Sequence, residues 1–347
     1  MTRMGMIVAL WAIGCGDPVE PVTPTPPDWM GAVFADHREV ALGRILLPGA
    51  FNSTSYACDP LQGISPHAPE SVLTLWGTSN PGETNAIRDR ETDWAKHQDR
   101  PLGQQLEEGI RFLELNLTLK DGVLTTWHSV YGVPVDVVLD DVVAFAAAHP
   151  SEAVVLTFGL DLVPDDWPLL ADALLAPRAG GTSVCDLLFN NADNAATATL
   201  ADLDAAGRNL VWGPDAELKA FLDGRGCGTS TLVQDRRWSI TTTPEGVSAA
   251  LADSVDSRDP AHLLVNDFAF SLDGSATTEE QVGYVLGYAS VREATEALGF
   301  AGDFPGRMIT EHDALDNMNV VAGAMYQDTN LIEASIAENE ARVAALP

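Results

Sequence analysis

Short apolar runs that alternate with helical patterns limit the fold of this chain more than any other feature. Residues 153–158 form a continuous apolar run after a loop, which is typical of a strand buried on both faces. Residues 135–148 just before it place Val138, Val142 and Ala146 at helical spacing. The predicted strands are 110–119, 122–128, 153–158, 209–212, 231–233, 263–265 and 319–324, and the predicted helices are 135–148, 165–175, 243–252, 278–298 and 330–345. This alternation predicts an α/β fold with a parallel sheet and helices outside it.

A parallel sheet with outer helices can close into a barrel or remain open and doubly wound. A nucleotide-binding open sheet carries a glycine-rich loop after an early strand, and the sequence has neither a dinucleotide fingerprint nor a P-loop there. We therefore favour the barrel, formed by one domain over residues 29–347.

The first residues resemble an export signal. Arg3 precedes a short apolar stretch, 4–13, which is too short to span a bilayer and ends at Gly14-Cys15. This pattern is similar to a bacterial lipoprotein signal over residues 1–15, with a lipid anchor on Cys15. An ordinary secretory signal cleaved nearby is the alternative. The proline-rich residues 16–28 then predict an extended linker, and we expect an exported protein held at the bacterial envelope or cell surface, or otherwise secreted.

The charge of the chain excludes one class of partner. Only 19 Lys and Arg stand against 50 Asp and Glu, which gives a formal net charge of −31. Such a surface repels phosphate backbones, so we expect no nucleic-acid binding, and it disfavours adsorption to anionic lipid through a basic patch. We expect a monomer that takes a small molecule or lipid headgroup.

Three cysteines follow Cys15, and export would permit a disulfide among them. Cys185 could pair with Cys227 and leave Cys58 free, or all three could be buried thiols. Connectivity does not follow from sequence alone.

Polar residues follow or interrupt the predicted strands at the places where a barrel carries its active site. Asn52 follows the apolar run 45–51, and Glu114 and Asn116 share one face of the strand 110–119. His128 ends the next strand. Further pairs at later strand ends are Gln234-Asp235, Asn266-Asp267 and Gln327-Asp328.

These residue types suit two kinds of chemistry. Carboxylate and amide oxygens bind hard cations such as Ca²⁺, and His128 could act as a general acid. Glu114 is the most informative of them, because burying a carboxylate in an apolar strand is costly without a partner or a metal. The sequence contains no Gly-x-Ser-x-Gly motif that would indicate a serine hydrolase.

Two motifs resemble a known family. Residues 47–53, Leu-Pro-Gly-Ala-Phe-Asn-Ser, are similar to the first signature of the phosphatidylinositol-specific phospholipase C catalytic (X) domain, and residues 105–115 resemble its second. His128 matches the second histidine of the family, and residues 150–156 match the strand that follows. Residues 233–235 and 326–328 resemble later strand ends.

This resemblance implies an irregular (β/α)₈ barrel of the TIM type. It also implies a phosphodiesterase in which the inositol 2-hydroxyl attacks phosphorus, giving diacylglycerol and a cyclic inositol phosphate. On this basis we assign His128, Asp235 and Asp328 to catalysis, and Gln234, Gln327 and Asn266 to substrate binding. Asn52, Glu114 and Asn116 are assigned to Ca²⁺, because they resemble the calcium-dependent branch of the family.

The sequence departs from the family pattern at two positions. The first histidine, the usual general base, falls on Phe51, and the arginine of the metal-independent branch falls on Asn116. A later acidic ligand of the calcium-dependent branch would fall near Gly159, and Asp161 lies close to it. Phe51 also motivates a second hypothesis, a headgroup-binding protein without turnover. A glycerophosphodiester phosphodiesterase ranks below both, since its His-Arg-Gly and Pro-Glu-Asn-Thr signatures are absent.

Overall fold

The computed structural model describes residues 27–68, 73, 81–191, 193–238, 243–256, 259, 262–268, 288–312 and 318–346. The predicted signal peptide, the lipid anchor on Cys15 and nearly all of the predicted linker lie outside these residues. The amino-terminal part of the predicted helix 278–298 lies outside them as well. Within the described part, no helix is both long enough and apolar enough to cross a bilayer.

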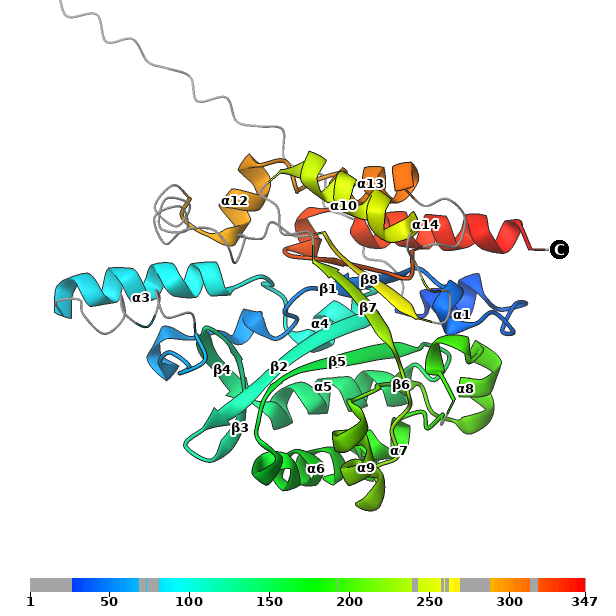
Figure 1. Ribbon diagram of the computed structural model, residues 1–347, viewed down its shortest axis with the longest axis horizontal. Coiled ribbons are helices and arrows are strands. Elements are labelled where there is room, and N and C mark those ends of the chain that lie inside the picture. Colours follow the sequence, from blue (N-terminus) through cyan, green and yellow to red (C-terminus); the bar gives the residue numbers. More distant parts are fainter. Residues whose placement is uncertain are drawn as a thin grey trace, which may run out of the picture.

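A nine-stranded sheet forms the centre of the protein (Figure 1). Its strands are β1 (Leu47–Ala50), β2 (Phe112–Lys120), β3 (Val123–His128), β4 (Val130–Pro134), β5 (Val154–Asp161), β6 (Leu210–Val211), β7 (Gln234–Trp238), β8 (Leu263–Phe268) and β9 (Val320–Gly323). Parallel ladders join the strands in the order β6, β5, β2, β1, β9, β8, β7. The α/β class with a parallel sheet is therefore confirmed.

The helices lie outside the strands. In Figure 1, α5, α6, α7, α8 and α9 lie on one side of the sheet, and α10, α13 and α14 lie on the other. The helices are α1 (Trp29–Val33), α3 (Pro81–Ala95), α4 (Leu102–Glu107), α5 (Val135–Ala148), α6 (Trp167–Leu175), α7 (Val184–Leu187), α8 (Leu200–Ala206), α9 (Ala216–Gly224), α10 (Pro244–Asp256), α12 (Val291–Ala297), α13 (Phe304–His312) and α14 (Leu331–Ala344). Over the described residues no ladder joins β6 to β7, so the barrel is irregular at this seam.

An antiparallel hairpin brings His128 to the carboxyl end of the barrel. Strand β2 continues beyond its pairing with β1, and β3 pairs with this extension from Leu117 to Lys120. Strand β4 then follows β3 through Ser129, whose φ is +57°. The hairpin therefore folds back beside the end of β1, where Asn52 lies.

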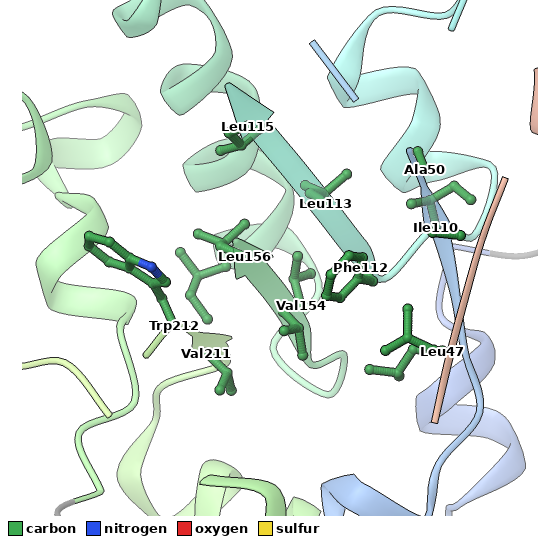
Figure 2. Close-up of a cluster of buried hydrophobic side chains, with 14 of the residues drawn as sticks. Leu47, Ala50, Ile110, Phe112, Leu113, Leu115, Val154, Leu156, Val211 and Trp212 are labelled. Atoms are coloured by element: carbon green, nitrogen blue, oxygen red, sulfur yellow. The ribbon is translucent and has the colours of Figure 1, made fainter. Parts of the chain in front are cut away.

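The core is apolar and continuous across the strands. Figure 2 shows side chains from β1, β2, β5 and the segment around β6 packed together, among them Leu47, Phe112 and Val154. Position 49 of the first motif has little room for a side chain, because a Cβ on Gly49 would lie 3.1 Å from both the Phe112 ring and the Ala322 side chain. The glycine of this motif therefore allows β1, β2 and β9 to pack closely.

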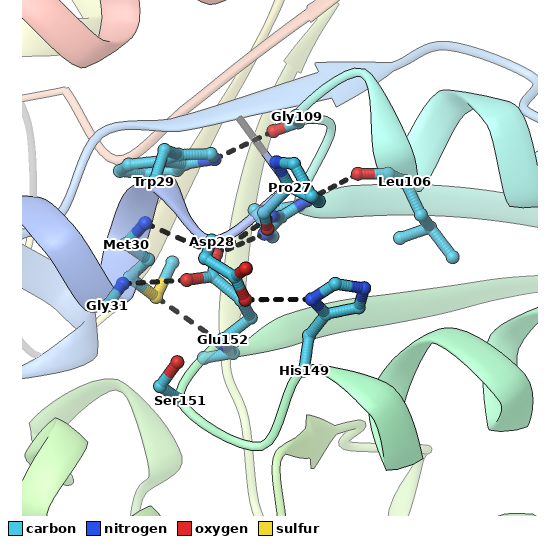
Figure 3. Close-up of polar contacts among 12 residues, drawn as sticks. Pro27, Asp28, Trp29, Met30, Gly31, Leu106, Gly109, His149, Ser151 and Glu152 are labelled. Carbon is cyan, nitrogen blue, oxygen red and sulfur yellow. Dashed lines mark hydrogen bonds and ion pairs between the residues drawn. The ribbon is translucent and has the colours of Figure 1, made fainter. Parts of the chain in front are cut away.

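The second motif supplies a buried ion pair rather than an active-site group. Arg111 and Glu152 have fully buried side chains, 2.8 Å apart. Glu152 accepts hydrogen bonds from the backbone N–H groups of Met30 and Gly31 (Figure 3). Arg111 donates to the carbonyl of Pro27. This pair ties the segment that enters the domain to the amino-terminal ends of β2 and β5, which is the face opposite the active site of a parallel barrel.

The structure answers two questions that the sequence left, the pairing of the cysteines and the position of the strand predicted at 231–233. Cys185 and Cys227 form a disulfide, and Cys58 is a buried free thiol. The strand predicted at 231–233 is displaced, because β7 begins at Gln234. The polar residues of β7 are compatible with a strand because Arg236 is paired with carboxylates of β2 and β8.

Candidate active site

Asn52 is the residue on which the site is built. It follows β1 in the left-handed backbone region, with φ of +48°, and its backbone N–H donates to Oε2 of Glu114 at 2.9 Å. The next residue, Ser53, donates its N–H to the Glu114 carbonyl and accepts from the Glu114 N–H. The end of β1 is thus fixed against the middle of β2.

The side chain of Asn52 joins three others. Its Oδ1 accepts a hydrogen bond from Asn116 Nδ2 at 2.6 Å. Its Nδ2 lies 2.8 Å from Nδ1 of His97 and 3.2 Å from Nε2 of His128. One amide group therefore contacts two imidazoles, and its orientation is set by Asn116.

His128 is oriented by the backbone. Its Nδ1 lies 2.8 Å from the carbonyl oxygen of Ala95, an acceptor, so Nδ1 carries the proton and Nε2 is free to accept. Burial lowers the pKa of His128, although the Ala95 carbonyl and the charge of Glu114 oppose this shift. The resting imidazole is therefore neutral at neutral pH, with an unprotonated nitrogen facing Asn52.

His97 lies beside Phe51, the residue that replaces the usual base. The two rings stack with centroids 5.1 Å apart and an angle of 20° between them. The rings of His97 and His128 are 4.5 Å apart. Burial lowers the pKa of His97 well below its usual value, and the neighbouring His128 lowers it further. Both histidines keep part of their surface exposed.

A charged cluster lies beside the histidines. Arg236 donates to Oε1 of Glu114 at 2.6 Å and binds both oxygens of Asp267, at 3.0 and 3.2 Å. Its guanidinium is 5.8 Å from the centre of the Phe51 ring. Burial acts to lower the pKa of Arg236, but Asp267 and Glu114 raise it by more, so this residue stays charged. One charged side chain from each of β2, β7 and β8 thus takes part in this cluster.

This arrangement does not fit Ca²⁺. Both oxygens of Glu114 already accept hydrogen bonds, one from the Asn52 backbone and one from Arg236, and Asn52 Oδ1 accepts from Asn116. A guanidinium therefore occupies the place beside the carboxylate that a cation would need. Among the described residues, no three His, Cys, Asp or Glu side chains are grouped as metal ligands.

Gly159 and Asp161 also bear on the calcium prediction. Gly159 pairs with Asn116 across β2 and β5, and a Cβ on it would lie 2.1 Å from Asn116 Oδ1. The amide of Asn116 therefore fills the space where an acidic side chain would stand. Asp161 lies two residues further along β5 and pairs with His67 at 3.8 Å.

The structure does not bring all of the predicted residues to this cluster. Asp235 faces away from it, because neighbouring strand residues point to opposite faces and Arg236 points in. Its carboxylate lies 3.4 Å from His262. Asn266 faces away for the same reason, since Asp267 contacts Arg236.

The remaining predicted residues are Gln234, Gln327 and Asp328. Gln234 is on the same face of β7 as Arg236, two residues closer to the amino-terminal end of the strand. Asp328 binds Arg292 at 2.8 Å, and Gln327 lies 3.4 Å from the sulfur of Met325. Of the nine predicted site residues, Asn52, Glu114, Asn116 and His128 are thus brought together.

Comparisons with known proteins bear on the family resemblance. The chain is 26% identical over 162 residues to mouse PI-PLC X domain-containing protein 2, covering 46% of each chain. It is 25% identical over 143 residues, 39% of each chain, to the variant-surface-glycoprotein phospholipase C of Trypanosoma brucei brucei. The matched segment spans about half the length or less of these relatives. No protein-family model matches the chain.

Solved structures extend the likeness to the whole barrel. The phosphatidylinositol-specific phospholipase C of Listeria monocytogenes superposes with a TM-score of 0.57, covering 90% of this chain and 98% of the other at 14% identity. A Staphylococcus aureus phosphatidylinositol-specific phospholipase C gives 0.57 over 91% and 97%. The resemblance to the phospholipase C X-domain family is confirmed. The irregular TIM-type barrel is confirmed with it.

Sequence reasoning missed two residues of this phospholipase C-like site. His97 lies in the loop between α3 and α4, outside both family motifs, in a polar context that attracts no attention. Arg236 lies within β7, directly after the pair Gln234-Asp235. A signal for Arg236 did exist, because a strand that carries two arginines inside a barrel must pair at least the inward one with a carboxylate.

Proposed function

We propose that the protein cleaves a phosphoinositide-like lipid diester by general acid/base chemistry, as a phospholipase C-type phosphodiesterase. The observation that carries this proposal is the meeting of His128 Nε2 with the Asn52 amide at the carboxyl ends of the strands. Active sites of parallel barrels lie at this end. The phospholipase C names of the relatives support the same reaction class.

In the proposed reaction, a hydroxyl group of the headgroup gives its proton to a base and attacks the neighbouring phosphorus. The bond between phosphorus and the lipid oxygen breaks, and His128, protonated at Nε2 when the anionic diester is bound, gives its proton to that oxygen. The products are a cyclic phosphate and a diacylglycerol. In the free protein, Asn52 holds the imidazole of His128 in place, and the Ala95 carbonyl fixes its tautomer. No step is assigned to Ca²⁺, because the donor set does not fit it.

The cluster around Arg236 bears on the charge near the substrate. Glu114 and Asp267 are buried, and their oxygens are bonded to Arg236 and to the Asn52 N–H. The guanidinium therefore offsets the carboxylate charge beside the place proposed for the anionic diester.

The second candidate function is headgroup binding without turnover, and Phe51 is the observation that favours it. The experiment that separates the two incubates vesicles containing phosphatidylinositol with the wild type and with His128→Ala, and measures release of a water-soluble phosphorylated headgroup. Release by the wild type alone supports the enzyme. Binding of headgroup in calorimetry without release supports the binder.

The location of the protein at a membrane is proposed from its sequence. A lipid on Cys15 would hold the barrel at a membrane that contains its substrate, with residues 16–28 as a spacer. Replacing Cys15 with Ser would move the protein from the membrane fraction to the soluble fraction. If the wild type is itself soluble after export, the anchor is excluded and an ordinary secretory signal remains.

A further inference from the structure

We infer that His97 is the general base of this site, in place of the histidine that the family carries at the position of Phe51. The inference rests on the proposed function and adds a residue to it. It starts from the ring stack, in which the imidazole of His97 lies against the phenyl ring of Phe51 at the end of β1.

The loop that carries His97 is fixed to the barrel on several sides. The N–H groups of His97 and Gln98 both donate to Ser55 Oγ, at 2.9 and 3.1 Å. The carbonyl of His97 accepts from the Met325 N–H at 2.7 Å. The side-chain amide of Gln98 donates to the carbonyls of Phe51 and Gly323 at 2.8 Å each. These bonds attach the loop to the ends of β1 and β9, so the position of the imidazole is set by the fold.

The hydrogen bonds define the protonation state of the two rings. The Asn52 Nδ2 group has two N–H donors, and it lies within bonding distance of His97 Nδ1 and His128 Nε2. Its orientation is set by the bond from Asn116 to Oδ1. Both ring nitrogens must then be acceptors, which makes both imidazoles neutral in the free protein. A neutral imidazole is the form that a general base needs.

The two histidines can be given separate roles. The Nδ1–H of His128 donates a hydrogen bond to the Ala95 carbonyl, so only Nε2 can exchange a proton with a substrate. When an anionic diester binds, His128 takes up a proton from water at Nε2, and the Asn52 amide moves away from it. The substrate hydroxyl then replaces the Asn52 N–H at Nδ1 of His97.

Each proton transferred in this step has a donor and an acceptor. His97 Nδ1 takes the hydroxyl proton as the hydroxyl oxygen bonds to phosphorus. The bond from phosphorus to the lipid oxygen breaks, and His128 gives its proton to that oxygen. His97 ends protonated and His128 neutral, and exchange with water restores both.

The test compares two substrates with different leaving groups. One is phosphatidylinositol in vesicles, and the other is an inositol phosphodiester with a nitrophenyl leaving group, which departs without a proton. His97→Asn puts an amide oxygen near the position of Nδ1, so it can still accept from Asn52 but cannot take a proton. We expect it to lower kcat by about 10²–10⁴-fold on both substrates. His128→Asn should lower kcat strongly on the lipid and much less on the nitrophenyl ester.

Two further variants complete the experiment. His312→Gln changes a histidine of α13 that is bonded to Ser248, outside the cluster described above, and should leave both rates unchanged. Phe51→His placed in the His97→Asn background should restore part of the activity, because it puts a base on the adjoining ring position.

The outcomes separate this role from the proposed function. Wild-type kcat in a folded His97→Asn protein, with the wild type active, overturns the role of His97 and leaves the phosphodiesterase standing. A wild type inactive on both substrates overturns the phosphodiesterase, and the role of His97 with it. A fall in the kcat of folded His97→Asn on both substrates, with partial recovery in the Phe51→His/His97→Asn double variant, supports the role of His97.

Discussion

The guanidinium of Arg236 donates to the carboxylate of Glu114 across 2.6 Å, inside the barrel. The family resemblance assigned this carboxylate to Ca²⁺, while its burial in an apolar strand called for either a partner or a metal. The partner comes instead from β7, more than a hundred residues later in the chain, at a sequence separation of 122. The first prediction follows from this pair.

We predict that catalysis and stability of the wild type do not respond to Ca²⁺. Activity with EDTA should stay within about twofold of activity with added Ca²⁺, since the two buried carboxylates, Glu114 and Asp267, are already paired with Arg236 and offer little to a hard cation. The Tm should be unchanged by Ca²⁺. In Arg236→Ala, by contrast, Glu114 and Asp267 lose their partner, and Ca²⁺ should raise the Tm. A rise in the Tm of the wild type with Ca²⁺ would restore the calcium-dependent arrangement.

Gly159→Ala should impair turnover without touching a catalytic group. The added Cβ would meet Asn116 Oδ1 at 2.1 Å, so the Asn116 amide must move, and Asn52 with it. A displacement of about 1 Å near reacting groups costs roughly 10²-fold in rate. The matched control is Gly224→Ala in α9, where an added Cβ meets no atom within 4 Å. Equal activity of the two variants would show that Asn116 does not position Asn52.

Glu152→Ala should destabilise the fold by about 3–5 kcal/mol, because it leaves the buried Arg111 without its counter-charge. It also removes the acceptor for the N–H groups of Met30 and Gly31. Urea unfolding measures the loss. Asp204→Ala, which breaks the more exposed pair with Arg38, should cost at most about 1 kcal/mol. Similar losses in both variants would contradict the anchoring role of the buried pair.

Glu91 makes the stability depend on pH. Burial raises its pKa from 4.5 to about 7, although a hydrogen bond with Ser129 opposes the shift. A raised pKa means that the contribution of this carboxyl to stability is complete below pH 4.5 and is lost as the pH rises through 7. Glu91→Gln should therefore be more stable than the wild type by about 3 kcal/mol near pH 8, with a difference close to zero near pH 4. Unfolding at both pH values checks this, and a constant difference would contradict it.

The sequence predicted the parts of the molecule that local pattern controls. Helix α5 has the predicted bounds, and β2 and β3 lie within about two residues of theirs, because their apolar spacing and the Asp121-Gly122 turn are strong local signals. The convergence of Asn52 and Glu114 was also predicted, since parallel strands bring their carboxyl ends together. His128 was predicted at the same place, but an antiparallel hairpin brings it there rather than a further parallel strand.

The rest of the site depends on information that is not local. Asp235 and Arg236 are neighbours in β7, and only the register of the strand decides which of them faces inward. His97 reaches the site because Ser55, Met325 and, through Gln98, Gly323 fix its loop, and these partners are far from the loop in the chain. No spacing rule connects a loop histidine to such contacts, so the second imidazole was not predictable.

Headgroup release from phosphatidylinositol vesicles is the most direct test of the proposed phosphodiesterase. The account predicts that the wild type releases a cyclic inositol phosphate and leaves diacylglycerol in the membrane, with EDTA present, and that folded His128→Ala does not. Release by the wild type that is no greater than release by His128→Ala would contradict it.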